Sequence, residues 1–515
     1  MNHALTFDQR EEAIKSAKEF FNHNNTENHD NEVTEGAANS LCLQLGYALN
    51  IKNKEHGILY SIFSSLELVY RCTLGVRRAS FDRIGMELIP LLIKSIEICE
   101  KDAENNGSVL KIIKIMNLLS EIDSASNYMA STRVVVTALL VGLQKQAEQQ
   151  VKFETISTFK NISYFAEEHR IQLVQEPLFI PYIAELSFLS TSNSIRELIS
   201  ETLRNLALAQ DTKIPMAQQG VLLNVIIHQT EYNSERIKLN AVITLGSLAI
   251  PVENNYWLIS HSEGAIIGAI IRLMNDNDSN IQERALKVLK RISRGDNVLF
   301  LIDYSNLLNT LSSLACSEYS TNIRVDAVEI ISSLLPYLDE QSCSSIVKLV
   351  RIMINLLINN NHNQKCLEII FHSLLKVSSS PTISALMVLD TEILQVLTSD
   401  LVSDPEIALL VFKMIFNIVS CQSKELRNTI MSSSRVLSML VDFVNLYKEG
   451  QHRRNISNLA ASILVLLSQD EMNRSHLAQH EGLILALVQF VTNTSVEISV
   501  KNEVKNIIVQ LVPLT

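Results

Sequence analysis

Segments with one shared apolar spacing recur along the chain. Each begins with Ile or Val and carries apolar or small residues four, eight and eleven positions later. At about 100° per residue these positions span an arc of roughly 80°, so each segment predicts a helix with one narrow buried face. The segments are VKFETISTFKNIS (151–163), IRELISETLRNLA (195–207), IKLNAVITLGSLA (237–249), IQERALKVLKRIS (281–293), IRVDAVEIISSLL (323–335), IALLVFKMIFNIV (407–419), ISNLAASILVLLS (456–468) and VKNEVKNIIVQLV (500–512).

The intervals between the third apolar positions of successive segments give the length of the repeat. These positions are Phe159, Leu203, Leu245, Leu289, Ile331, Phe371, Ile415, Leu464 and Ile508, with intervals of 44, 42, 44, 42, 40, 44, 49 and 44 residues. The long interval coincides with NLYKEGQHRR (445–454), which we predict to be an extended loop. Ile115 and Val69 continue the series upstream with degenerate flanking patterns. About ten repeats of about 42 residues therefore fill the chain.

Glycines mark a second fixed point in three repeats. Gly220, Gly264 and Gly482 each precede an apolar helical stretch and lie 25, 25 and 26 residues before the third apolar position. A short helical stretch precedes each glycine, and a polar loop separates the apolar stretch from the long helix. Each repeat is therefore predicted to be an all-α unit of three helices.

This pattern resembles the armadillo repeat family. The residues that carry the resemblance are AQQGVLLNVIIHQ with IKLNAVITLGSLA, HSEGAIIGAIIRLM with IQERALKVLKRIS, and AQHEGLILALVQF. HEAT repeats are a near alternative, but they are two-helix units without the Gly-led middle helix. The resemblance implies a right-handed α-solenoid whose third helices line a concave groove that binds extended peptides or partner proteins.

The solenoid is predicted to span residues 37–515, with degenerate repeats over 37–120 and clearer repeats over 121–515. Residues 1–36 are predicted to be a helix and a flexible polar linker. The helix, TFDQREEAIKSAKEFF (6–21), starts with a T-x-x-Q capping box. It is expected to cap the first repeat, because the end of a solenoid exposes an apolar face, or alternatively to recruit a partner.

Positions 3, 6 and 10, counted from the first Ile or Val of each segment, lie beside the buried stripe. They predict a partner-binding flank, and an amide there can both donate to and accept from an extended backbone. The alternative is a solvated flank at which any polar residue serves. The candidate residues are Asn161, Asn205, Ser247, Arg284, Lys287, Arg291, Lys413 and Asn417.

The nuclear-import adapters of the family pair each such asparagine with a tryptophan one turn earlier. Here Ser157, Glu201 and Lys413 stand four residues before Asn161, Asn205 and Asn417, and the only tryptophan is Trp257, outside these helices. We therefore do not expect a receptor for classical nuclear-import signals.

Arg284, Lys287 and Arg291, extended by Arg294, place four cations on one predicted helix. They suggest a site for an acidic or phosphorylated segment, because guanidinium groups suit carboxylates and phosphates. The alternative is that Asp326 and Glu329, one repeat later, neutralise them. RRASF (77–81) resembles a basophilic kinase site, with Ser80 as the candidate phosphorylated residue in an expected loop.

Composition and the absence of known motifs make several classes of function less expected. The formal net charge of −11 argues against a nucleic-acid binder. Seven scattered cysteines without a C-x-x-C pair suggest reduced thiols, and we recognise no signal peptide or membrane span, so a cytoplasmic or nuclear location is expected. No catalytic, cofactor or metal motif is recognised in the sequence, so we expect no enzyme, cofactor or metal.

We therefore expect a non-catalytic scaffold or adaptor, monomeric by itself, that binds a protein segment along the groove. A transport or trafficking adaptor and a regulatory subunit of a larger enzyme complex stay open as alternatives.

Overall fold

The computed structural model describes most of the chain from residue 79 onward. The described residues are 41–43, 45, 62–64, 67, 79–99, 106–144, 147–294, 300, 301, 304–316, 319–334, 343–359, 364–389, 391–398, 404–421, 423–445, 451–493, 496 and 498–512. The predicted N-terminal helix and linker, together with Val69, lie outside them. The chain divides into two compact units, Met1–Arg284 and Ala285–Thr515.

The first unit consists of helices in successive sets of three. α4 (Ala79–Cys99) and α5 (Asn106–Leu119) precede the complete sets. The sets are α6 (Asp123–Ser131), α7 (Arg133–Val141) and α8 (Gln149–Phe165); α9 (Glu167–Gln175), α10 (Phe179–Leu189) and α11 (Asn193–Leu206); and η2 (Gln210–Thr212) with α12 (Lys213–Ala217), α13 (Gly220–Gln229) and α14 (Glu235–Leu248). A further set is α15 (Asn254–Ser260), η3 (His261–Gly264) with α16 (Ala265–Met274), and α17 (Ser279–Ile292), inside which the division between the units falls.

The second unit is built in the same way. It begins with α19 (Ser305–Leu314), α20 (Thr321–Leu334), α21 (Cys343–Asn359) and α22 (Gln364–Val377). Sets of three follow: α23 (Pro381–Leu389), α24 (Thr391–Leu397) and α25 (Pro405–Ser420); α26 (Lys424–Ser432), α27 (Ser434–Val444) and α28 (Gln451–Leu467); and α29 (Glu471–Gln479), α30 (Leu483–Thr492) and α31 (Ile498–Leu511). The described residues contain no β-strand, so the all-α prediction is confirmed.

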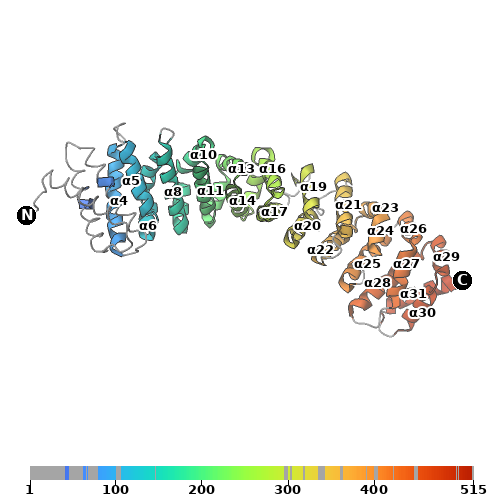
Figure 1. Cartoon of the computed structure of the whole chain (residues 1–515). Helices are drawn as coiled ribbons and strands as arrows, with labels where there is room; N and C mark the ends of the chain where they lie inside the picture. The colour runs from blue at the N-terminus through green and yellow to red at the C-terminus, as the bar shows by residue number, and fades with distance from the viewer. Residues whose placement is uncertain are drawn as a thin grey trace, which may run out of the picture. The chain divides into compact units, whose positions relative to one another are not determined.

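The recurring apolar segments form the third helices of the three-helix sets, and α20 and α22, whose repeats show two helices among the described residues, are counted with them. These third helices are α8, α11, α14, α17, α20, α22, α25, α28 and α31. Within the first unit α8 packs against α5 and α11, and α11 packs against α14; within the second, α25 packs against α22 and α28, and α28 against α31 (Figure 1). The third apolar positions are buried from Phe159 to Leu464, whereas Ile508 of α31 is half-buried. Apolar burial between neighbouring repeats therefore holds the stack together.

Side-chain caps fix where several third helices begin. The Ser192 and Ser234 hydroxyls accept from the backbone N–H groups of Ile195 and Ile237, at the starts of α11 and α14. Asp404 caps α25 in the same way. A capping oxygen satisfies one of the N–H groups that the first turn of a helix leaves without a partner.

A hydrogen bond connects the first helix of several repeats to the end of the preceding third helix. In several repeats a polar side chain near the start of the first helix contacts a carbonyl near the end of the preceding third helix. The contacts are His169 to Ile162 O, Thr212 to Leu206 O, Asn254 to Leu248 O and Arg427 to Val419 O. These bonds satisfy carbonyls that the helix end would otherwise leave open, and they hold the junction in one geometry.

The glycines differ in their backbone roles. Gly264 and Gly482 have φ values of 85° and 80°, in the left-handed region that favours glycine. Gly220 instead begins α13 without a positive φ. In η3, Ser262 and Glu263 also have positive φ.

The predicted loop at 445–454 is wrong for its last four residues. α28 begins at Gln451, so residues 451–454 form its first helical turn. His, Arg and Gln are tolerated in helices, and the helix-breaking residue of this stretch, Gly450, comes immediately before it.

Candidate partner-binding surface

The third helices of the first unit carry a polar face that is cross-linked between repeats. Asn117 of α5 donates to Glu154 of α8 through a 2.8 Å Nδ2–Oε2 hydrogen bond. Arg236 of α14 pairs with Glu197 and Glu201 of α11. Glu154 and Glu201 lie at positions 3 and 6 of their segments, and Asn117 lies at position 10 when Ile115 is taken as the third apolar position. Arg236 comes one residue before the first Ile of its segment. Polar side chains therefore link successive third helices of this unit.

The predicted asparagines also bond to the preceding repeat. Nδ2 of Asn161 donates to Ser120 Oγ at 2.9 Å, and Nδ2 of Asn205 donates to Ser163 Oγ at 3.2 Å. In the second unit Asn417 donates to Ser378 Oγ at 3.1 Å. We call this recurring contact the Asn–Ser clasp.

The asparagines of the clasp are less exposed than residues of a solvated flank would be. Asn161 and Asn205 are 8% and 3% exposed, whereas Asn417 is half-buried. Asn240, at position 3 of α14, makes the same contact to Ser200, with an Nδ2–Oγ distance of 3.0 Å. A serine 39 to 42 residues before each of these asparagines is the sequence signal that we did not use.

The other candidate residues of the flank differ in their surroundings. Ser247 is half-buried and its hydroxyl donates to Ile243 O within α14. Lys413 is exposed on α25, one turn before Asn417. A ligand role for any of these residues stays a prediction.

On α17, Arg284 and Lys287 are exposed and Arg291 is half-buried. Arg284 Nε donates to Asn280 Oδ1 at 3.0 Å within the helix. Burial, and then the adjacent charge of Arg294, lower the pKa of Arg291 below its ordinary value. The charge of Arg294, two residues after the end of α17, therefore disfavours the charged form of Arg291.

Asp326 and Glu329 of α20 form their ion pairs with a different cation, Lys290. Its Nζ lies 2.7 Å from Asp326 Oδ1 and also contacts Glu329. Burial alone would lower the pKa of Lys290, but the hydrogen bonds and charges of these two carboxylates raise it above its ordinary value. Asp326 and Glu329, which the sequence suggested as neutralising groups, therefore pair with Lys290 of α17.

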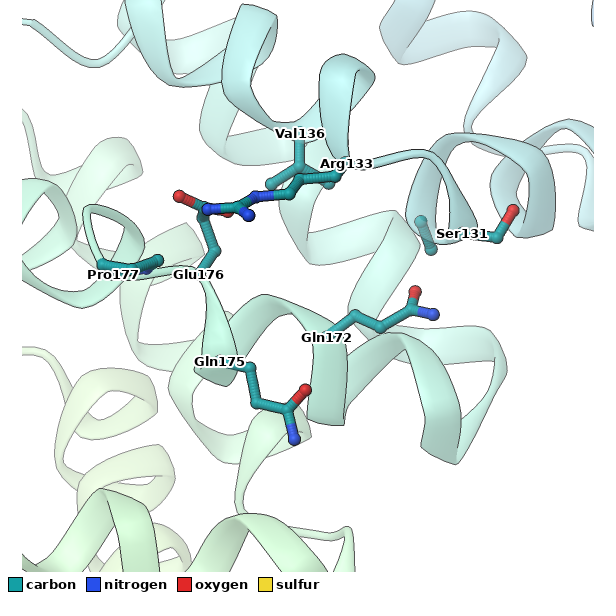
Figure 2. A pocket seen from close by; sticks show the side chains of 8 residues that line it. Ser131, Arg133, Val136, Gln172, Gln175, Glu176 and Pro177 are labelled. Carbon is teal, nitrogen blue, oxygen red and sulfur yellow. The ribbon is translucent and has the colours of Figure 1, made fainter.

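A pocket of about 320 Å³ lies between two repeats of the first unit, away from the third helices. The end of α6, the start of α7 and the end of α9 line it (Figure 2). Arg133 and Glu176 form an ion pair on its wall, with Nε and Oε2 3.1 Å apart. Ser131, Gln172 and Gln175 add hydroxyl and amide groups, so the pocket can form hydrogen bonds and contains one paired charge of each sign.

The described part of the chain offers little other chemistry. No group of three or more His, Cys, Asp or Glu side chains there could hold a metal ion. The described cysteines are free thiols; burial, and then Glu87, raise the pKa of Cys42 to about 12. The backbone of Ser80 lies in the first turn of α4 and not in the expected loop, whereas Arg77 and Arg78 are outside the described residues. Among the described helices, none has the length and apolar character to cross a membrane.

Comparisons with known proteins match structures but not sequences. No family model and no curated protein matches the chain. An engineered protein of known structure is 14% identical, with a TM-score of 0.46, over 92% of this chain and 98% of its own. A designed armadillo repeat protein is 16% identical, with a TM-score of 0.37, over 46% of this chain and 96% of its own.

A second designed armadillo repeat protein, solved in complex with the peptide (KR)4, is 15% identical, with a TM-score of 0.39, over 48% of this chain and 99% of its own. Among the described residues, sets of three helices recur, and third helices pack side by side. The fold is an armadillo-like helical repeat. Trp257 lies in a first helix of this armadillo-like fold, α15, and therefore outside the third-helix face, as the sequence indicated.

Proposed function

We propose that this chain is a non-catalytic scaffold or adaptor that binds a protein segment along its third-helix face. The observation that supports it most is the packing of third helices side by side in each unit, so that positions 3, 6 and 10, many of them polar, recur from repeat to repeat. Such a face offers recurring hydrogen-bonding groups to an elongated ligand, and a rigid surface reduces the entropy cost of binding one.

The clasps give this face its rigidity. Asn161, Asn205 and Asn417 each use their donor group on a serine of the preceding repeat. The flank is therefore ordered before a ligand arrives, and the half-buried or exposed residues beside the clasps, such as Ser157, Ile243 and Lys413, are the ones that contact it.

Affinity purification of the full chain followed by mass spectrometry tests the proposal. Position 6 is changed in the first unit by Ser157→Arg and Ile243→Arg together. Glu185→Arg, at an exposed position of the second helix α10, is the matched control. We expect partners of the wild type to be retained by the control and lost from the double variant. Equal recovery from both variants, with unchanged circular dichroism, would count against the third-helix face.

The identity of the recovered partners separates the kinds of adaptor. Cargo receptors or pore components would favour a transport or trafficking adaptor, and cytoskeletal or signalling proteins would favour a scaffold. A stoichiometric catalytic subunit would indicate a regulatory role within an enzyme complex.

A second candidate ligand is an acidic or phosphorylated segment near Arg284, Lys287 and Arg291. It is favoured by the like-charge effect of Arg294 on Arg291, which an anion would relieve. We expect the triple variant with Glu at these positions to lose binding to a phosphorylated peptide. Lys290→Glu is not a suitable control because it would break the ion pairs with Asp326 and Glu329. The control is Lys505→Glu, which changes an exposed lysine of α31 outside positions 3, 6 and 10.

A further inference from the structure

The junctions between third helices and the next first helices carry an exposed apolar row in the first unit. Tyr164, Leu208 and Ile250 stand at position 13 of α8, α11 and α14, counted as above, and are 67%, 51% and 48% exposed. Their spacing in the sequence, 44 and 42 residues, is the spacing of the repeat. Exposed apolar side chains that gather on one surface mark a place that another molecule can cover.

A carboxylate follows each member of the apolar row three residues later. Glu167, Asp211 and Glu253 occupy these places, and all are exposed. Glu168 adds a fourth negative charge beside Glu167. Because acidic residues are also favourable at the N-terminal turns of helices, the carboxylates do not by themselves indicate a ligand; they indicate the charge of the molecule that covers the apolar row.

One hydrogen bond shows that the first two junctions lie next to each other. Glu167 Oε1 accepts a hydrogen bond from the backbone N–H of Gln210 at 2.8 Å, one residue before Asp211. The carboxylate of one junction therefore reaches the backbone of the next junction. The hydrogen bonds of His169, Thr212 and Asn254 to the ends of the preceding third helices hold all three junctions in the same arrangement.

The surface has an excess of negative charge. Within residues 147–294, all of which are described, Glu167, Glu168, Asp211 and Glu253 form no ion pair. The cations of the same junctions are Arg170 and Lys213. Arg170 donates to the carbonyls of Ser163 and Tyr164, and Lys213 donates to the Gln210 side chain. Four carboxylates against two such cations favour a positively charged partner.

We propose that these three junctions form a docking surface for a basic amphipathic helix of a partner protein. Packed helices lie about 8–10 Å apart, so neighbouring members of the apolar row recur at about that distance. Two turns of an α-helix rise about 10.8 Å, which places apolar residues of the partner seven positions apart opposite Tyr164, Leu208 and Ile250. Lysine or arginine beside each apolar residue meets the carboxylates. This surface is separate from the flank at positions 3, 6 and 10, and the proposal does not depend on a ligand binding there.

The probe is a fluorescently labelled synthetic peptide of about 18 residues, long enough for apolar residues at i, i+7 and i+14 of a helix. It carries leucine at those positions and lysine beside them. Fluorescence anisotropy with the full chain measures its dissociation constant. A scrambled peptide of the same composition tests whether the apolar spacing matters.

Two sets of substitutions separate the apolar row from the charges. The first set, Tyr164→Ser, Leu208→Ser and Ile250→Ser together, is expected to weaken binding at least about tenfold. The second set, Glu168→Lys, Asp211→Lys and Glu253→Lys, is expected to weaken it similarly and to reduce its dependence on salt. Glu167 is left unchanged because it holds the Gln210 N–H.

A matched control exists within the same unit. Val134, Leu178 and Val221 also recur at repeat spacing and are 59%, 50% and 55% exposed, but they lie at or just before the starts of α7, α10 and α13. Changing these three to serine removes similar exposed apolar area and is expected to leave the dissociation constant unchanged.

Three results would overturn the proposal. They are equal binding of the scrambled peptide, equal binding by the apolar-row variant with an unchanged circular dichroism spectrum, and equal loss in the control variant. Light scattering after size exclusion tests whether a second copy of the chain covers the surface. A dimer that the apolar-row variant abolishes would assign the surface to self-association instead.

Discussion

The two units are built from the same repeat but differ where each third helix ends. In the first unit position 13 is Tyr164, Leu208 or Ile250, with a carboxylate three residues later. In the second unit the described counterparts are Arg294, Lys376, Ser420 and Gln469, and all are exposed. The apolar positions four, eight and eleven residues after the first Ile or Val are nevertheless similar in both units.

This difference distinguishes positions that stabilise the repeat from positions that are free to bind another molecule. Positions inside the stripe are buried against neighbouring helices, so most substitutions there reduce stability. Position 13 contacts solvent in both units and can change its chemistry without changing the fold. Polar residues at this exposed position in the second unit are expected. The apolar residues that recur there in the first unit need a further explanation.

The largest stability difference between the units is expected at two glycines. A Cβ on Gly142, at the end of α7, would lie 2.2 Å from Thr155 Oγ1 of the buried α8 face. Gly142→Ala should therefore destabilise the first unit by about 2 kcal/mol, the usual range for overpacking. Hydrogen exchange of α8 amides measures the change within that unit.

Gly482 in the second unit is the contrasting case. A Cβ there meets no atom within 4 Å, but its φ of 80° disfavours alanine. Gly482→Ala should therefore lower the free energy of opening of α30 by about 1 kcal/mol, measured by hydrogen exchange of its amides.

A double variant tests the cause of the effect at Gly142. Thr155→Ala combined with Gly142→Ala should be no less stable than Thr155→Ala alone. A double variant that loses the full sum of both single effects would show that the contact with Thr155 is not the cause.

The Asn–Ser clasps allow a comparison with a smaller expected effect. Asn205 is 3% exposed and donates to Ser163 Oγ and Lys160 O, whereas Asn417 is half-buried. Asn205→Ala should lower the opening free energy of α11 by about 1.5 kcal/mol, and Asn417→Ala should lower that of α25 by about 0.5 kcal/mol, because water replaces the lost bond more easily there.

A double-mutant cycle with Ser163→Ala assigns the effect to the clasp itself. Coupling between Asn205→Ala and Ser163→Ala is expected, because each removes one partner of the same hydrogen bond. Additive effects would mean that Asn205 stabilises α11 in another way.

The sequence predicted the repeat well because burial constrains it strongly. Leu203, Leu245 and Leu289 had to face a core, and the structure buries each of them completely. The direction of a polar side chain at the edge of the stripe is set by the neighbouring repeat, about 42 residues away. The sequence therefore placed Asn205 on the flank but did not reveal its bond to Ser163.

The same reason explains the charged residues of α17. Arg284, Lys287 and Arg291 stood out as a set, but Lys290, one residue before Arg291, is the cation that contacts Asp326 and Glu329. A step of one residue turns a helix by about 100°, so the sequence pattern alone did not show that Lys290 faces these two carboxylates.

The smallest expected difference between the units is in their response to pH. Burial alone would raise the pKa of Asp276, but the hydrogen bonds from Lys238 and Asp278 and the Lys238 charge lower it below its ordinary value. Its contribution to stability is therefore present above about pH 4 and is lost as the pH falls through the lowered pKa. Lys290 in the second unit has a raised pKa, so its contribution is present below its ordinary pKa and is lost as the pH rises through the raised value.

Asp276→Asn should therefore flatten the acid side of the stability profile for the first unit, and Lys290→Met should flatten the alkaline side for the second. Hydrogen exchange, corrected for the intrinsic rate at each pH, follows α14 for the first change and α20 for the second. Because both side chains are partly exposed, solvent screens their interactions and each effect should be smaller than that of a clasp variant. An equal response of both units to either substitution would mean that the pH dependence does not arise from these ion pairs.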